Sequence, residues 1–125
     1  MNVLLIDDDI TCLKSIGKAL TINGIPNRRF ISPREAVDCY RSEHFDVVVT
    51  DLKMPEMNGI EVLKAIRTIN PEANVIILTA YDDDDKKELA YQNGVHSFLH
   101  KSIPFENFLD VLMKINKTQG VKKND

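Results

Sequence analysis

Short apolar runs alternate along this chain with segments whose apolar residues recur at helical spacing. Such alternation predicts an α/β fold, in which parallel strands are joined by helices that cover both faces of one doubly wound sheet. The strands are expected at Val3–Ile6, Asn27–Ile31, Asp46–Thr50, Asn74–Leu78 and His96–Leu99. The second run contains two adjacent arginines, so we expect it at an edge of the sheet.

The helices fit between and after these strands. They are expected at Ile10–Asn23, from Ser32 onward, at Gly59–Ile69, from Asp82–Asp85 to Gly94, and along the stripe Phe105, Phe108, Leu109, Leu112 and Ile115. The first should bury a seam of Cys12, Ile16, Ala19 and Leu20. The second should begin with a capping box, because Glu35 follows Ser32 by three residues.

Length and composition narrow the class of protein. A chain of 125 residues suits one domain, which we place at residues 1–117, with a polar tail at Thr118–Asp125. The formal charge of −3 offers no basic field, so we expect no nucleic-acid binding by this domain. No apolar run is long enough for a membrane helix, and the start resembles no signal peptide. Cys12 and Cys39 lack metal-ligand spacing and should be reduced thiols of a cytoplasmic protein.

Polar side chains follow four of the expected strands. Asp7 and Asp8 come after the first, Asp51 after the third, Thr79 after the fourth and Lys101 after the fifth. Because parallel strands end at the same edge of a sheet, where ligands of such sheets bind, these groups are expected to converge. Several carboxylates at one edge repel each other unless a cation holds them together.

This set of residues suits phosphoryl transfer to a carboxylate. Mg²⁺ prefers oxygen ligands and is often held by one or two carboxylates, so Asp8 and Asp51 are expected to bind it directly and Asp7 through water. Asp51 is the expected nucleophile. Lys101 and the metal would neutralise the transferring oxygens, and the Thr79 hydroxyl would hydrogen-bond one of them.

Each residue alone also has an ordinary structural explanation. The run Asp7–Asp9 could cap the first helix. Asp51 could belong to a turn, Thr79 could be a strand-end hydroxyl, and Lys101 could be a solvated surface charge. The order and strand-end placement of all of them together favour a functional site.

The sequence also resembles the receiver domain of two-component response regulators. The resemblance rests on Ile6-Asp-Asp8, Val49-Thr-Asp-Leu-Lys-Met-Pro55 with Asn58-Gly59, Leu78-Thr-Ala80 and Lys101. It implies a five-stranded flavodoxin-like (βα)5 sheet in the order 2-1-3-4-5. It further implies that Asp51 is phosphorylated, with Mg²⁺, from a histidine kinase or histidine phosphotransferase. The backbone carbonyl of Lys53 becomes a further metal ligand, and Thr79 and Phe98 form the switch.

One position departs from the family pattern. Receivers usually carry a proline directly after the lysine, often in a cis peptide, whereas this chain has Ser102 there and proline only at Pro104. A cis bond before a residue other than proline costs about 2.5–4 kcal/mol. The Lys101–Ser102 bond is therefore either trans or strained.

Other interpretations remain open from the sequence. Asp7-Asp8-Asp9-Ile10-Thr11 also matches the pattern of haloacid-dehalogenase-type phosphatases, in which Asp7 would be the nucleophile. A pseudo-receiver that binds partners without phosphorylation is another possibility. The chain could also be the receiver of a longer regulator, and it could be a monomer or a phosphorylation-dependent dimer, with an unknown downstream partner.

Overall fold

The computed structural model describes the backbone of residues 1–124 and the side chains of residues 1–116. It contains a five-stranded sheet in the order β2-β1-β3-β4-β5, in which every neighbouring pair is parallel. The strands are β1 (Val3–Ile6), β2 (Asn27–Phe30), β3 (Val47–Thr50), β4 (Val75–Thr79) and β5 (Ser97–His100). The helices are α1 (Ile10–Ile22), α2 (Pro33–Ser42), α3 (Gly59–Ile69), α4 (Asp84–Gln92) and α5 (Phe105–Asn124). The predicted fold class and strand order are confirmed.

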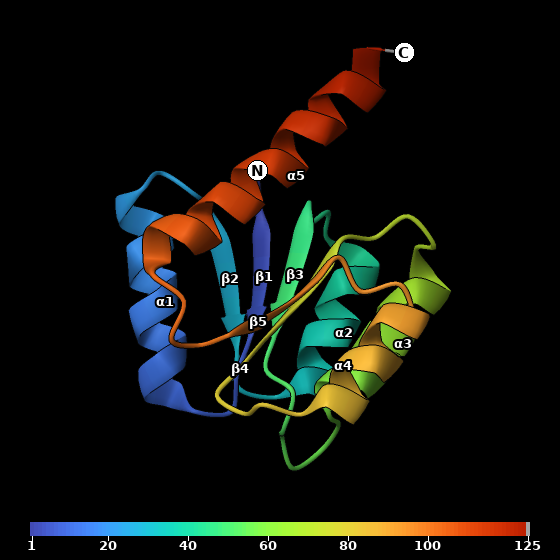
Figure 1. Ribbon diagram of the computed structural model, residues 1–125. Coiled ribbons are helices and arrows are strands. Elements are labelled where there is room, and N and C mark those ends of the chain that lie inside the picture. Colours follow the sequence, from blue (N-terminus) through green and yellow to red (C-terminus); the bar gives the residue numbers. More distant parts are fainter. Residues whose placement is uncertain (125) are drawn as a thin grey trace.

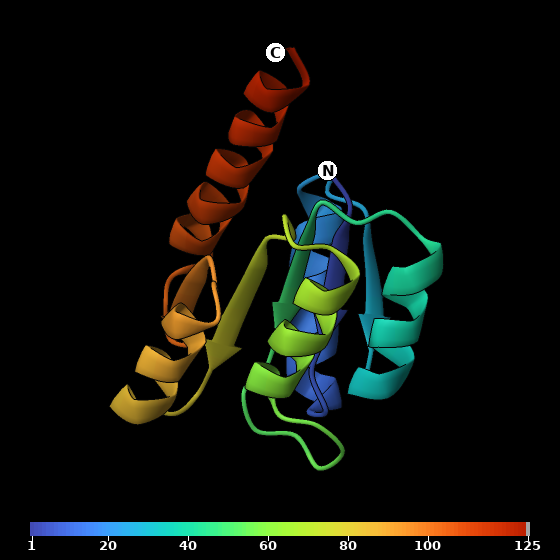
Figure 2. The same ribbon diagram turned by 90° about the vertical axis from the view of Figure 1, so that its right-hand side faces the viewer.

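Each central strand is buried on both faces, with α1 and α5 on one side and α2, α3 and α4 on the other (Figures 1 and 2). Leu4 and Ile6 belong to the core under α2, α3 and α4, whereas Val3 and Leu5 belong to the core under α1 and α5. This alternation follows from the two-residue period of a strand. As expected for an edge strand, β2 exposes both of its arginines.

Local signals in the sequence fix where helices begin. Asp9 caps α1, and Ser32 caps α2 by accepting a hydrogen bond from the N–H of Glu35. Among the described residues the reciprocal capping box forms at α3, between Asn58 and Glu61, and only half of the box predicted at Ser32 is seen. The start of α3 ends the loop that follows β3.

Two sequence-based expectations need correction. The buried stripe of α1 is Leu13, Gly17 and Leu20, whereas Cys12, Ile16 and Ala19 are half-buried. The helix thus has a buried stripe and an adjacent half-buried stripe, and the predicted seam combined residues from both. In addition, β4 and β5 each end one residue later than expected, because Thr79 pairs with His100 and prolongs the ladder.

The last helix projects beyond the body of the molecule (Figures 1 and 2). Phe108, Leu112 and Ile115 are its buried residues in the core shared with α1. Its backbone stays helical to Asn124, so the helix runs through most of the segment predicted as a polar tail, Thr118–Asp125, whose side chains lie outside the described residues. Within the described part of the chain, every helix is too short or too polar to traverse a lipid bilayer.

We expect Gly59→Ala to lower the free energy of unfolding by about 1–3 kcal/mol, the usual cost of overpacking. A Cβ at Gly59 would collide with the backbone carbonyl oxygen of Asp51 and lie 3.0 Å from the Cα atom of Leu52, and neither can move without shifting the end of β3. Urea denaturation measures the change. Gly17→Ala is the matched control, because the three atoms nearest to its Cβ would all belong to the flexible end of the Arg29 side chain rather than to the backbone. Equal losses in both variants would contradict the explanation.

Candidate functional site

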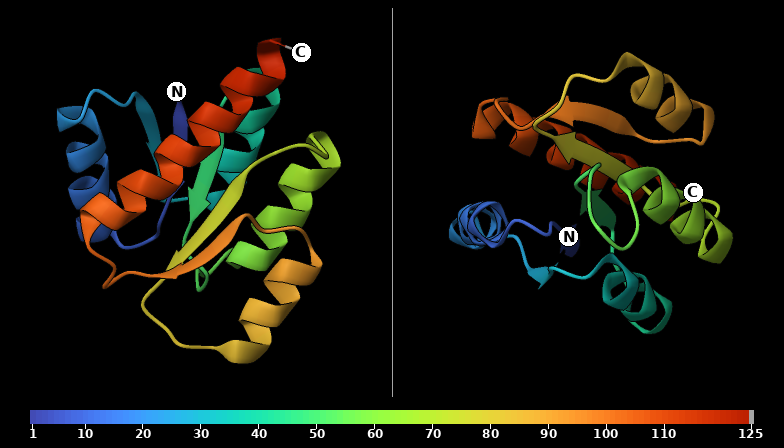
Figure 3. Two further views of the ribbon diagram at one scale, coloured as in Figure 1. Left: turned by 45° about the horizontal axis from the view of Figure 1, so that its top comes forward. Right: turned by 90° about the horizontal axis from the view of Figure 1, so that it is seen from below.

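Three carboxylates meet at the carboxyl edge of the sheet, where β1 and β3 end side by side. Asp7, Asp8 and Asp51 each place an oxygen within 4.8 Å of the others. The backbone fixes this arrangement, because the Asp51 N–H donates to the carbonyl of Ile6 at 3.0 Å and so extends the pairing of the two strands. The right-hand view of Figure 3 looks onto this edge of the molecule. The convergence predicted from the strand ends is confirmed for these three residues.

Lys101 reaches the same site from the end of β5. Its Nζ atom lies 2.7 Å from Oδ2 of Asp7 and 3.3 Å from Oδ2 of Asp51. The lysine side chain is 17% exposed and its two partners are 4% and 9% exposed, so water screens these ion pairs only weakly. The alternative of a solvated surface lysine is therefore wrong.

The charges of the site are not balanced. Burial raises the pKa of Asp51, the neighbouring Asp7 charge raises it further, and Lys101 opposes both effects. Burial lowers the pKa of Lys101, but its hydrogen bond to Asp7 and the charges of Asp51 and Asp7 outweigh burial and raise it overall. With three carboxylates ionised against one ammonium group, two negative charges remain uncompensated, which suits a divalent cation.

The aspartates of the first loop have different roles. Asp9 is the helix cap: its Oδ1 accepts from the N–H of Thr11 at 3.0 Å and of Cys12 at 3.3 Å. Asp7 is buried, binds Lys101 and accepts from the N–H of Asp9 at 2.9 Å. Asp8 is exposed. The capping explanation therefore holds for Asp9 alone, and the other two carboxylates face the site.

Thr79 and Phe98 lie on the α4 side of the site. Thr79 is fully buried, and its Oγ1 accepts from the N–H of Tyr81 at 3.2 Å. Phe98 is half-buried and packs against the core under α2, α3 and α4. A cavity of about 120 Å³ separates these two side chains from the loop that leads into α4, and Tyr81 and His100 also line it.

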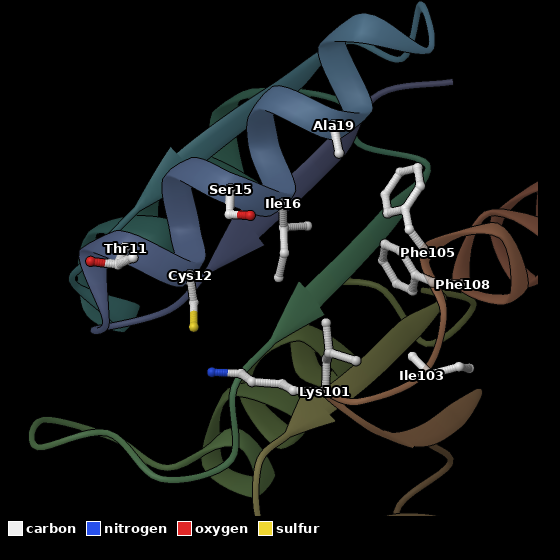
Figure 4. A pocket seen from close by; sticks show the side chains of 10 residues that line it. Thr11, Cys12, Ser15, Ile16, Ala19, Lys101, Ile103, Phe105 and Phe108 are labelled. Atoms are coloured by element: carbon white, nitrogen blue, oxygen red, sulfur yellow. The ribbon is translucent and has the colours of Figure 1, made fainter.

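The structure also shows contacts that the sequence did not reveal. Lys53 Nζ lies 4.1 Å from the centre of the Tyr81 ring, so a cation–π contact joins the loops after β3 and β4. A larger cavity of about 380 Å³ lies between α1 and the start of α5, with Lys101 at one end and Phe105 and Phe108 at the other (Figure 4).

Cys12 and Cys39 are free thiols, and burial raises the pKa of both.

The Lys101–Ser102 bond is trans, as is every other peptide bond in the described part of the chain. Lys101 reaches Asp7 and Asp51 with this geometry, so its placement requires no cis peptide. A turn follows directly, in which the Ile103 N–H donates to the carbonyl of His100 at 3.0 Å.

Fold and site together define a doubly wound α/β domain with an acidic, lysine-bridged site at its carboxyl edge. Residues 3–113 match the family model of the response regulator receiver domain. The chain therefore belongs to this family and is a receiver domain of two-component signalling. This membership excludes the haloacid-dehalogenase alternative, in which Asp7 would be the nucleophile.

Known proteins agree with this assignment. The chain is 33% identical over 111 residues to the DNA-binding transcriptional regulator NtrC of Proteus hauseri, covering 89% of this chain and 24% of NtrC. It is 33% identical over 114 residues to the transcriptional regulatory protein ZraR of Escherichia coli K12, covering 91% of this chain and 26% of ZraR. The chain thus spans about a quarter of the length of these relatives.

Solved structures share the fold. A receiver domain protein from Clostridium thermocellum superposes with a TM-score of 0.87 at 32% identity, covering 96% of this chain and 98% of that one. A CheY-like receiver domain protein from Methanospirillum hungatei JF-1 gives a TM-score of 0.88 over 95% of this chain and 96% of that one. At 22% identity, the latter similarity concerns the fold alone.

We expect Asp51→Asn to raise the midpoint of thermal unfolding near pH 7 by about 4 °C, equivalent to about 1 kcal/mol in a domain of this size. Burial and the Asp7 charge disfavour the ionised carboxylate, while an asparagine oxygen can still accept the 2.8 Å hydrogen bond from the Leu52 N–H. Circular dichroism in the presence of EDTA measures the midpoint. Asp38→Asn, at an exposed position of α2, is the control.

The difference in stability between wild type and Asp51→Asn should depend on pH. The pKa of Asp51 in the folded protein lies above the unfolded value of about 3.9, so the folded state takes up its proton first as the pH falls. Wild-type stability therefore gains on that of the variant as the pH falls below neutral, and the difference shrinks as the pH approaches the unfolded pKa of about 3.9. A variant less stable than wild type at neutral pH would contradict this account.

Proposed function

We propose that Asp51 accepts a phosphoryl group from a phosphohistidine of a histidine kinase or histidine phosphotransferase. The observation that carries the proposal is the cluster of Asp7, Asp8 and Asp51 within 4.8 Å, with Lys101 bonded to two of them. A site of this kind combines a nucleophile, a cation and a place for a metal. The protein would thus catalyse its own phosphorylation as a signalling domain rather than turn over an external substrate.

The site residues suit Mg²⁺. All three side chains offer carboxylate oxygens, the ligands that this ion prefers. We infer that Asp8 and Asp51 bind it directly, that Asp7 acts through water, and that the backbone carbonyl of Lys53 completes the protein ligands. When bound, Mg²⁺ offsets the negative charge of the transferring phosphoryl oxygens.

In the transfer itself, a carboxylate oxygen of Asp51 attacks phosphorus as the phosphorus–nitrogen bond of the donor breaks. The imidazole leaves with the electron pair of that bond, and an acyl phosphate forms on Asp51. The Lys101 ammonium group, already 3.3 Å from Asp51, is placed to pair with one phosphoryl oxygen. The Thr79 hydroxyl can donate a hydrogen bond to another.

The same residues can convert phosphorylation into a change of shape. Thr79 Oγ1 now accepts from the Tyr81 N–H, and turning toward a phosphoryl group would break this bond. The cavity beside Thr79 and Phe98 leaves room for the ring to follow. The face made by α4, β5 and α5 would then differ between the two states, and a partner protein or output domain would bind it. NtrC, named as a DNA-binding transcriptional regulator, is about four times as long as the stretch that this chain matches.

The acceptor is tested by incubating the protein with phosphoramidate and Mg²⁺ and measuring its intact mass. We expect wild type and the surface variant Asp38→Asn to gain one phosphoryl group and Asp51→Asn to gain none, because an amide oxygen is a poor nucleophile. EDTA should suppress the gain in wild type. A gain that persists in Asp51→Asn would refute the assignment of Asp51 and indicate another acceptor. Absence of the gain from wild type would refute it and favour a pseudo-receiver.

The switch is tested with Thr79→Ala. This variant should still gain the phosphoryl group at Asp51 but lose most of the amide chemical-shift change over α4 and β5, because no hydroxyl follows the phosphoryl group. Two-dimensional NMR before and after phosphorylation measures the change. Thr79→Ser is the matched control, since it retains the hydroxyl and should respond nearly as wild type. A full response in Thr79→Ala would rule out this relay.

A further inference from the structure

The ends of β4 and β5 stay paired up to the edge of the site. Thr79 pairs with His100, and the Lys101 N–H donates to the Thr79 carbonyl at 2.7 Å. Beyond these residues the two segments diverge, one toward α4 and the other toward α5. The two side chains that would contact a phosphoryl group, Thr79 and Lys101, therefore stand where the backbone ladder stops.

The His100 side chain bridges the segments after they diverge. Its Nε2 atom lies 3.1 Å from the carbonyl oxygen of Ala80, the residue after Thr79. Its Nδ1 atom lies 3.1 Å from the backbone N–H of Ser102, the residue after Lys101, and 2.7 Å from the Ser102 hydroxyl. A single imidazole thus touches the backbone next to both phosphoryl-contacting residues.

The hydrogen-bond partners of His100 determine which ring nitrogen carries the hydrogen. A carbonyl oxygen only accepts, so Nε2 must carry the hydrogen, and a backbone N–H only donates, so Nδ1 must be the acceptor. The neutral ring with its hydrogen on Nε2 satisfies both backbone contacts at once. The contact with Ser102 further requires a residue that has a backbone N–H, which proline lacks.

We propose that His100 is a positioning residue for phosphoryl binding. By fixing Ala80 against Ser102, it holds the backbone of Thr79 and of Lys101 so that both side chains converge on Asp51. His100 touches neither Asp51 nor the aspartates proposed as metal ligands in any hydrogen bond or ion pair of the described residues. The inference rests on the proposed function, and its effect falls on the phosphoryl group rather than on the metal.

Three substitutions separate the two contacts. In His100→Asn, the side-chain oxygen can take the place of Nδ1 and keep the Ser102 contact, while the Ala80 contact is lost. In His100→Gln, the longer side chain can place an N–H near Ala80, while the Ser102 contact is lost. His100→Phe keeps the ring and loses both contacts. His96→Phe is the matched control, because His96 precedes β5 at its opposite end, and the one side-chain hydrogen bond it makes within the described residues is to the Ser97 hydroxyl, at 2.8 Å.

The readout is the affinity for beryllofluoride, which binds a carboxylate as a phosphoryl mimic, at saturating Mg²⁺, with the Mg²⁺ affinity measured separately by calorimetry. We expect affinity for beryllofluoride to fall about threefold in His100→Asn and His100→Gln, a net loss typical of one exposed hydrogen bond, and about tenfold in His100→Phe. Mg²⁺ affinity should not change in any of them. The rate of phosphorylation by phosphoramidate should fall in the same order.

Each result has a defined meaning. Wild-type beryllofluoride affinity in His100→Phe would overturn the inference, and so would a loss matched by His96→Phe. An equal loss of Mg²⁺ affinity would show general loosening of the site rather than positioning, and would also overturn it. Failure of wild type to gain a phosphoryl group would instead refute the proposed function. The two failures are therefore distinguishable.

Discussion

The contact of the Lys101 ammonium group with Asp7 and Asp51 is the constraint on which this site depends. It joins the end of β5 to the ends of β1 and β3, across β4. The Nζ atom lies 2.7 Å from Oδ2 of Asp7 and 3.3 Å from Oδ2 of Asp51. Removing Lys101 would leave two buried carboxylates unpaired, which would cost more than the ion pairs contribute. The two carboxylates and the lysine therefore form one unit. The negative charge that remains at the site is what a bound divalent cation would neutralise.

Much of this arrangement could be predicted from the sequence, because the strand topology determines which residues come together. Once parallel strands are recognised, their carboxyl ends must share one edge. Asp7, Asp51 and Lys101 directly follow such ends, and Thr79 is the last residue of its strand. The errors were of the kind that local patterns cannot resolve. Thr79 and His100 belong to their strands only because they pair with each other, and that pairing is a tertiary contact between residues 21 positions apart (100 − 79).

What the sequence could not supply are contacts between loops. The different roles of Asp7, Asp8 and Asp9 depend on which carboxylate contacts Lys101, a residue 94 positions after Asp7 in the sequence. The His100 bridge and the Lys53–Tyr81 contact join segments that share no periodic pattern. In the same way, Cys12, Ile16 and Ala19 have the spacing of a core seam but line the cavity between α1 and α5. Such features depend on where the chain returns, which propensity and spacing do not encode.

The contacts also limit how the switch can work. Thr79 already accepts a hydrogen bond from the Tyr81 N–H, so turning to a phosphoryl oxygen exchanges one bond for another. Replacing a neutral hydrogen bond by a charge-assisted one gains about 1 kcal/mol. Moving a population from 1:99 to 99:1 requires about 5.5 kcal/mol. In the proposed switch, Thr79 alone therefore cannot drive the change. Lys101, the packing of Phe98 into the adjoining cavity and a partner that binds only the switched face would have to supply the rest.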